Sequence, residues 1–174
     1  MSRIVVVGGG AAGLELVTRL GRQFREKGEH EVVLVERATC HYWKPRLHEV
    51  AAGSFDTELD AVSYSQHAAC SGYRYVQASM FGLDRNNKSL QLRGQDDKTM
   101  ELGYDYLVLA VGATSNDFAT PGVAENCQFI DSSFQALRVW QQIEPLLKSS
   151  GKRRVTIVGA GATGVELAAE LSRV

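Results

Sequence analysis

Apolar runs and amphipathic stretches alternate along the first part of the chain. Residues 4–7 are all isoleucine or valine, and residues 31–36 hold a second apolar run that ends in Glu36. Runs of this kind are typical of parallel strands that are covered on both faces. Residues 14–24 carry apolar side chains at helical spacing, and Gly28 is placed to end that helix. The pattern predicts a β–α–β unit, and therefore an α/β fold built on a parallel sheet.

The middle of the chain has the shorter period of antiparallel strands. Alternating apolar residues, interrupted by a turn at Asn86-Asn87 and by polar residues 94–98, predict a small antiparallel meander at about residues 73–102. Residues 104–113 are again an apolar run, and we expect a further buried strand there, ending in small side chains. The strands expected within the meander span residues 73–80, 89–93 and 99–102.

Three helices are expected after the second strand: a short one with Leu47, Val50 and Ala51 on one face, and two more at residues 59–69 and 132–147. Pro45 is acceptable in the first turn of the first of them, and Gly53 is placed to end it. Ser132 or Ser133 can cap the last helix, and Pro145 should end or bend it.

A glycine-rich turn, the first glycine loop (residues 8–13), joins the first strand to the first helix. Gly8, Gly10 and Gly13 have the spacing G-x-G-x-x-G. The first glycine allows a tight turn, the second lets a pyrophosphate approach the backbone, and the third lets the helix lie close to the sheet. Phosphates then meet free N–H groups at the helix N-terminus. This loop favours dinucleotide binding, and a purely structural turn is the alternative.

Glu36 stands about where a dinucleotide site requires a carboxylate, at the end of the second strand. A carboxylate there accepts hydrogen bonds from the two ribose hydroxyls, and it would repel a 2′-phosphate. A solvated strand end is the alternative interpretation of Glu36.

The opening pattern returns near the end of the chain. Residues 155–158 repeat the β-branched run, and Gly159, Gly161 and Gly164 repeat the glycine spacing in a second glycine loop (residues 159–164). One such loop indicates one dinucleotide, and two indicate two. The second copy lacks the next strand and its terminal acid, which a complete Rossmann unit needs. We therefore interpret the chain as the N-terminal part of a longer protein.

The repeat also predicts a domain boundary near residue 150. Residues 1–150 would form the first domain, and residues 151–174 the truncated start of a second. A lone strand–helix unit cannot bury both faces of its strand. Residues 153–174 should therefore pack on the first domain, pair with another copy, or fray.

Composition limits the function classes without choosing among them. A hydrophobic content of 44%, a charged content of 22% and a net charge of −1 describe an ordinary globular protein and give no reason to expect nucleic-acid binding. No apolar run approaches the roughly 18 residues of a membrane span, and no signal peptide precedes the first strand, so we expect a cytosolic location or one that faces the cytosol. Cys40, Cys70 and Cys127 form no metal-ligand pattern and are expected to be reduced thiols.

Residues 40–53 leave the carboxyl edge of the predicted sheet, where open α/β sheets hold their ligands. Lys44 is therefore a candidate for contacting an anionic part of a cofactor, and a solvent-exposed lysine is the alternative. We expect packing and hydrogen-bonding roles, not catalysis, for His41, Tyr42, Trp43 and His48.

These residues together resemble the two-dinucleotide-binding-domain flavoproteins, and most closely the bacterial type II NADH dehydrogenases, the single-subunit respiratory NADH:quinone oxidoreductases. The most specific segments are HYWKPRLHEVAAGS at residues 41–54 and GATSNDF at residues 112–118, with TPGV next at residues 120–123. The resemblance covers essentially the whole chain. It implies a Rossmann-like FAD-binding domain, a parallel sheet with an inserted antiparallel meander, and then the first strand and helix of an NAD-binding Rossmann domain.

The resemblance also implies roles for individual residues. FAD would bind at the first glycine loop, with Glu36 on the adenosine ribose, Lys44 near the flavin side and the backbone around Ala78 beside the adenine. Val111 stands where the second flavin-contacting motif usually has a threonine, so any hydroxyl contribution is lost there. The cofactor-binding residues implied for FAD and NADH are Gly8, Gly10, Ala11, Ala12, Gly13, Glu36, Arg37, Lys44, Ala78, Ala110, Val111, Gly112, Gly159, Gly161 and Gly164.

The candidate catalytic residue is Glu166, the acid two residues past the last glycine of the second glycine loop. In the family NADH binds at this loop, and the acid lies near the nicotinamide and flavin rings. Spacing alone favours a solvated helix carboxylate for Glu166.

The implied reaction is hydride transfer from NADH to FAD and then electron transfer to a quinone, by a peripheral protein at the cytoplasmic face of the inner membrane. A disulfide route is not expected, because Cys40 has no close cysteine partner. The alternatives are a related reductase with another acceptor, of the sulfide:quinone or ferredoxin type, and a non-enzymatic flavin-binding sensor. The 174-residue chain alone is expected to be inactive, to hold FAD weakly or not at all, and to self-associate through residues 155–158.

Overall fold

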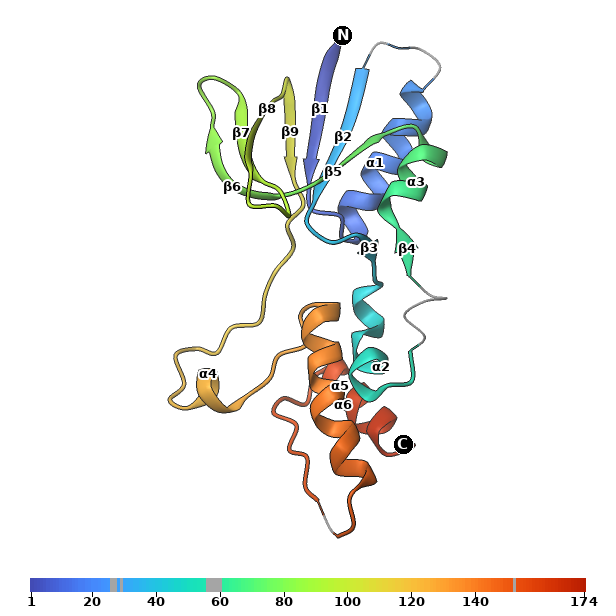
Figure 1. The fold of residues 1–174 in the computed structure, drawn as a ribbon, viewed down its shortest axis with the longest axis vertical. Helices are drawn as coiled ribbons and strands as arrows, with labels where there is room; N and C mark the ends of the chain where they lie inside the picture. Colours follow the sequence, from blue (N-terminus) through green and yellow to red (C-terminus); the bar gives the residue numbers. More distant parts are fainter. Residues whose placement is uncertain (26–27, 29, 56–60, 152) are drawn as a thin grey trace. The chain divides into compact units, whose positions relative to one another are not determined.

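The computed structural model describes residues 1–25, 28, 30–55, 61–151 and 153–174 (Figure 1). The chain divides into two compact units, the first made of Met1–His41 and Val62–Gly112 and the second of Tyr42–Ala61 and Ala113–Val174. The predicted domain boundary near residue 150 stays a prediction.

The first unit is built on a parallel sheet of four strands in the order β5-β2-β1-β9. The central pair aligns Val5 with Val33, and β1 also aligns Val6 with Val108 on its other side. This confirms the predicted α/β fold with a parallel sheet. The strands span Ser2–Val7 (β1), His30–Glu36 (β2), Arg74–Gln77 (β5) and Tyr106–Leu109 (β9).

The sheet is covered on both faces, as the continuous apolar runs predicted (Figure 1). Val6 and Leu34 point to one face, where they pack with Val17 under helices α1 (Ala11–Phe24) and α3 (Tyr64–Ser71). Val5 and Val33 point to the other face, against the predicted antiparallel meander. The meander consists of β6 (Ser79–Asp84), β7 (Ser89–Arg93) and β8 (Thr99–Gly103). Because successive side chains of a strand point to opposite faces, the first unit has three layers: the two helices, the parallel sheet and the meander.

Two strand predictions need correction. Residues 73–80 form two strands instead of one, because β5 ends at Gln77 in the parallel sheet and β6 starts at Ser79 in the meander. The strand predicted at residues 104–113 is confined to β9, because its partner β1 ends at Val7, opposite Leu109. Apolar alternation continues through both places, so the pattern alone does not show where hydrogen-bonding partners change.

The second unit is helical. Its core is formed by apolar residues of α2 (Leu47–Ala52), which ends at the left-handed Gly53, and of α5 (Ser133–Lys148). Two leucines of α6 (Ala162–Leu171), Leu167 and Leu171, pack against them. The Ser132 hydroxyl accepts the Gln135 N–H at the start of α5, which confirms the predicted cap, but the helix continues past Pro145 to its last turn. The elements are a 3-10 helix η1 (Lys44–Arg46), α2 (Leu47–Ala52), α4 (Val123–Asn126), α5 (Ser133–Lys148) and α6 (Ala162–Leu171).

The helix predicted at residues 59–69 is only partly testable, since residues 56–60 lie outside the described residues. Within its described part the helix begins later than predicted, as α3, because Val62–Ser63 form a strand, β4, which pairs antiparallel with β3 (Cys40–His41). None of the described helices combines the length and the apolar character needed to cross a membrane.

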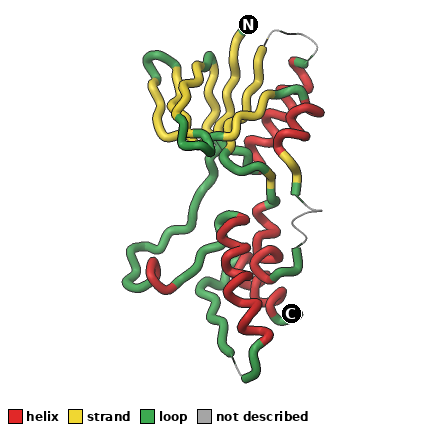
Figure 2. Tube along the Cα trace, in the orientation of Figure 1, coloured by secondary structure: helices red, strands yellow, loops and turns green. Residues whose placement is uncertain are grey.

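Of the predicted second strand–helix unit, only the helix has formed. This helix, α6, packs on α2. Residues 155–158, however, are loop and not strand (Figure 2). The side chain of Val158 is 84% exposed. A strand requires a hydrogen-bonding neighbour, and no described strand pairs with this segment. A helix satisfies its backbone within itself, which is why only the helical half of the unit has formed.

Candidate functional site

The first glycine loop is a tight turn between β1 and α1. Gly8 has a φ of 103°, and a Cβ there would lie 2.4 Å from the carbonyl oxygen of Ala110. A Cβ on Gly13 would lie 1.8 Å from the Gly8 carbonyl oxygen. Only glycine fits at either position, because the loop closes on itself and on the end of β9.

Gly10 differs from these two glycines because its surroundings are open. It is the N-cap of α1 with a φ of −64°, and no other heavy atom lies within 4 Å of an added Cβ. Gly10, Ala11 and Ala12 are exposed, and among the described residues no group accepts a hydrogen bond from their N–H groups. Free N–H groups at the positive end of a helix dipole suit a phosphate. The residues present therefore fit the pyrophosphate of a dinucleotide.

Glu36, at the end of β2, braces this loop. One carboxylate oxygen accepts the Gly9 N–H at 2.8 Å, and the other accepts the Ala38 N–H at 2.9 Å. Each oxygen keeps a second lone pair, and the residue is partly exposed, so hydroxyl groups of a ribose can still donate to it. Glu36 is therefore not a freely solvated strand end.

Other predicted cofactor residues lie at the same end of the sheet. Ala78 is buried and its N–H donates to the Glu36 carbonyl at 3.3 Å, while the Ala110 N–H donates to the Val7 carbonyl at 2.8 Å. Arg37 and residues 111–112 are exposed beyond their strand ends. The carboxyl end of the sheet thus carries Gly8, Gly10, Gly13, Glu36, Arg37, Ala78, Ala110, Val111 and Gly112.

The second glycine loop has the same backbone conformation as the first, although no strand leads into it. Gly159 has a φ of 112°, and a Cβ on Gly164 would lie 2.1 Å from the Gly159 carbonyl oxygen. Gly161 caps α6 with φ −72° and ψ 175°, close to the φ −64° and ψ −173° of Gly10. The second loop therefore presents an equivalent helix N-terminus.

Lys44 and Glu166 belong to the second unit. The Lys44 ammonium donates to the Ala113 carbonyl at 3.2 Å. Glu166 is exposed on α6, with one carboxylate oxygen 3.4 Å from Nδ1 of His48 on α2. This Nδ1 is buried and makes no hydrogen bond to any described residue.

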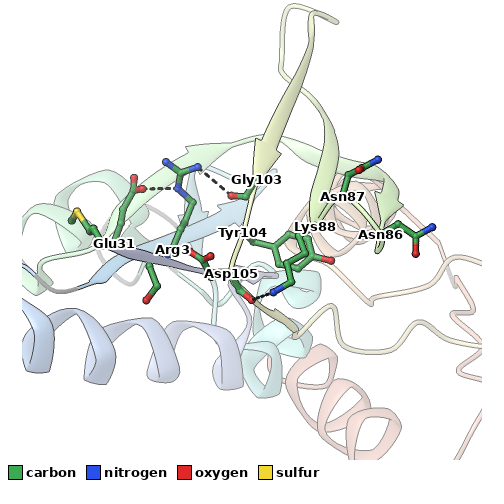
Figure 3. Close-up of a pocket in the computed structure, with 10 residues that line it drawn as sticks. Arg3, Glu31, Asn86, Asn87, Lys88, Gly103, Tyr104 and Asp105 are labelled. Carbon is green, nitrogen blue, oxygen red and sulfur yellow. Dashed lines mark hydrogen bonds and ion pairs between the residues drawn. The ribbon is translucent and has the colours of Figure 1, made fainter.

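A surface hollow lies at the opposite, amino end of the sheet, lined in part by Arg3, Glu31, Lys88 and Asp105 (Figure 3). Arg3 is paired with Glu31 and also donates to the Gly103 carbonyl at 3.2 Å, and Lys88 donates to the Asp105 carbonyl at 3.4 Å. Its main cationic groups are therefore already engaged. The hollow also lies away from the edge where open α/β sheets bind ligands.

A family model for the pyridine nucleotide-disulphide oxidoreductases matches residues 2–174. The chain belongs to this family. Within the pyridine nucleotide-disulphide oxidoreductases, it is 41% identical to the type II NADH:quinone oxidoreductase of Haemophilus influenzae over 98% of its length, and it spans 45% of that protein. The chain is therefore a homologue of the type II enzymes, as the sequence motifs predicted.

Two solved structures have the same fold as this chain. NDH2 from Plasmodium falciparum in complex with NADH has a TM-score of 0.83 and 23% identity, covering 98% of this chain and 37% of that one. The sulfide:quinone oxidoreductase of Aquifex aeolicus has a TM-score of 0.69 and 20% identity, covering 86% and 33%. The Rossmann-like parallel sheet with antiparallel strands is thus confirmed, and the chain spans less than half the length of these relatives.

Sequence reasoning missed two features of the first glycine loop. Gly9 occupies a variable position of the motif, yet it is buried, and a Cβ on it would lie 2.5 Å from the Tyr64 hydroxyl. Tyr64 was expected only as part of a helix. The sequence offers one signal of this contact, namely that Gly9 is a glycine at a position where the motif allows any residue. That signal does not identify Tyr64 as the partner.

Proposed function

We propose that this chain forms the FAD-binding part, and the start of the NADH-binding part, of a flavin-dependent NADH:quinone oxidoreductase. The observation that carries the proposal is the pair of glycine loops, which share one backbone conformation and each open a helix. A protein with two dinucleotide sites is suited to passing hydride between two dinucleotides. A bound flavin would supply the redox chemistry, taking hydride from NADH and passing electrons to a quinone.

In this proposal the first glycine loop holds the FAD pyrophosphate through the N–H groups of Gly10, Ala11 and Ala12. Glu36 accepts the adenosine ribose hydroxyls, and Lys44 contacts the flavin side. The cofactor-binding set is completed by residues at the carboxyl end of the sheet, namely Gly8, Gly13, Arg37, Ala78, Ala110, Val111 and Gly112.

The second glycine loop, with Gly159, Gly161 and Gly164, holds NADH in the proposed enzyme. Glu166 follows this loop on α6 and lies near the reacting rings, with His48 beside its carboxylate. The domain boundary near residue 150 separates the two nucleotide sites in the proposed enzyme.

Quinone is the acceptor that the Haemophilus influenzae relative supports, since it is a type II NADH:quinone oxidoreductase at 41% identity. The sulfide:quinone oxidoreductase shares only the fold, at 20% identity. Cys40, Cys70 and Cys127 are free thiols, and sulfide chemistry needs well-placed cysteines.

We further infer that the family-length protein works at the cytoplasmic face of the inner membrane as a peripheral protein. The chain by itself is expected to self-associate, because apolar side chains remain uncovered. Leu109 on the edge strand β9 is 51% exposed and Val158 is 84% exposed, and open strand edges and apolar patches promote association. The molar mass in solution, measured by light scattering over a range of concentrations, tests this.

Two experiments test the function. Titration of the chain with FAD should show weak binding at most. An activity assay of the chain should show no reduction of a quinone by NADH. The family-length protein should show NADH-dependent bleaching of its flavin, followed by reoxidation with a quinone but not with a ferredoxin. Absence of bleaching would point instead to a flavin-binding sensor, and reduction of quinone by sulfide in place of NADH would identify the other acceptor class.

A further inference from the structure

The peptide groups of Gly9, inside the first glycine loop, are held from both sides. Its N–H donates to Glu36, as described above. Its carbonyl oxygen accepts a hydrogen bond from the Tyr64 hydroxyl at 2.6 Å and lies 3.0 Å from Nδ1 of His41. A carbonyl oxygen only accepts, so His41 must donate through an Nδ1–H. Two donors therefore occupy both lone pairs of this one carbonyl.

A short antiparallel ribbon brings the two donors together. Cys40 pairs with Ser63 and His41 with Val62 in β3 and β4, and the Tyr64 N–H donates to the Thr39 carbonyl at 3.0 Å. Tyr64 then begins α3 and is only 3% exposed. Its ring stacks on Tyr75, with 5.5 Å between the ring centroids.

The Tyr64 hydroxyl is well suited to remain a donor. Burial, with a further contribution from the nearby Glu36 charge, raises the pKa of Tyr64 well above its ordinary value. Phenolate formation is therefore suppressed near neutral pH, and the hydroxyl keeps the proton that it donates to Gly9.

The direction of the Gly9 carbonyl fixes the direction of the next N–H. A trans peptide is planar, so the C=O of one residue and the N–H of the following residue point in opposite directions. The Gly9 carbonyl points to Tyr64 and His41 in the interior. The Gly10 N–H must then point away from them, toward the open side of the loop, where an added Cβ would meet nothing within 4 Å.

We propose that Tyr64 and His41 are positioning residues that clamp the Gly9 carbonyl and thereby aim the Gly10 N–H at the pyrophosphate of a bound dinucleotide. The proposal rests on dinucleotide binding at the first glycine loop, and it adds two side chains that lie 32 and 55 positions away from Gly9 in the sequence. The loop would thus be ordered before the ligand arrives, so less conformational entropy is lost on binding.

The decisive variant is Tyr64→Phe, which removes one hydroxyl and leaves the stacked ring in place. Tyr73→Phe is the matched control, because Tyr73 lies in the same buried cluster and its hydroxyl bonds His67 Nδ1 at 3.0 Å, away from the loop. ADP and adenosine are the probes, since they share the nucleoside and differ in the pyrophosphate. NMR titration of the 174-residue chain measures binding even when it is weak, and relaxation of the Gly10 amide measures the order of the loop.

We expect Tyr64→Phe to weaken ADP binding about three- to tenfold, the equivalent of one neutral hydrogen bond, to leave adenosine binding unchanged and to increase the mobility of the Gly10 amide. The double variant with His41→Gln should extend both effects. Tyr73→Phe should leave ADP binding and Gly10 mobility as in the wild type.

Equal ADP binding and an equally ordered Gly10 in Tyr64→Phe and the double variant would overturn the clamp while leaving the proposed function intact. A loss of adenosine binding equal to that of ADP would also overturn it, because a general loss of structure would then explain the result. An unchanged mobility of the Gly10 amide in Tyr64→Phe overturns the clamp whether or not the chain binds the probes, whereas absence of ADP binding by the family-length protein would refute the proposed function.

Discussion

Glu36→Gln perturbs the first glycine loop with little change of shape, because it replaces one carboxylate oxygen by an NH₂ group. The carboxylate accepts two backbone N–H groups, from Gly9 at 2.8 Å and from Ala38 at 2.9 Å. Glutamine has a single acceptor oxygen, so one of these N–H groups would face another donor. Loss of a hydrogen bond to a charged group costs about 1.5–3 kcal/mol, and partial exposure places the expected loss near the lower end, about 1.5 kcal/mol. Urea unfolding measures this loss.

The same variant should weaken ADP and FAD by about 1–3 kcal/mol, because the ribose hydroxyls lose a charged acceptor. Comparison of ADP with 2′-deoxy-ADP shows whether the ribose is contacted. In the wild type the missing hydroxyl should reduce affinity, whereas in Glu36→Gln it should matter much less, which is the non-additivity expected of directly interacting groups.

Glu31→Gln is the control on the same strand. Glu31 pairs with Arg3 and Arg74 at the other end of β2, so its replacement should leave ADP affinity unchanged. The ribose contact would be refuted if wild type and Glu36→Gln bound ADP equally well and showed the same ratio of ADP affinity to 2′-deoxy-ADP affinity. Glu36 would then keep only the bracing role.

Three further predictions follow from the described contacts. Gly10→Val should lower the free energy of unfolding by no more than about 1 kcal/mol, because valine is a poorer N-cap residue than glycine, and it should abolish ADP binding in a calorimetric titration. Gly13→Ala should instead leave the chain without a cooperative unfolding transition in circular dichroism, because its Cβ meets backbone at 1.8 Å. Burial raises the pKa of Tyr73 and Tyr75 to about 12, so both should ionise late in an ultraviolet titration, and stability should fall as the pH rises from about 10 toward those values. Burial alone would raise the pKa of Glu31, but hydrogen bonds from its two arginine partners lower it overall; this contribution to stability should be lost as the pH falls below about 4.3, and acid unfolding of Glu31→Gln should lack it.

The parts of the fold that rest on local pattern were predictable from the sequence. The continuous apolar runs predicted β1 and β2, the glycine spacing predicted the loop that joins β1 to α1, and a serine predicted the cap of α5. Each of these depends on residues close together in the chain, whose preferences agree with the final structure.

The remaining features depend on partners that the pattern does not name. Ala78 interrupts what reads as one strand, because the chain passes there from one sheet to another. Residues 155–158 have a strand-like sequence but no neighbour to pair with. The bonds from Tyr64 and His41 to the Gly9 carbonyl bridge segments that no local period connects, so only the folded chain shows them.

The two glycine loops also bear on the order in which the chain folds. In each, the closest approach joins the first and third glycines, which are five positions apart, as in Gly8 and Gly13. Closing so short a segment costs little chain entropy, and such contacts form quickly. The pairing of Val6 with Val108, by contrast, must wait for about 100 further residues. During synthesis, the turn that receives a phosphate can therefore take shape well before the sheet that supports it is complete.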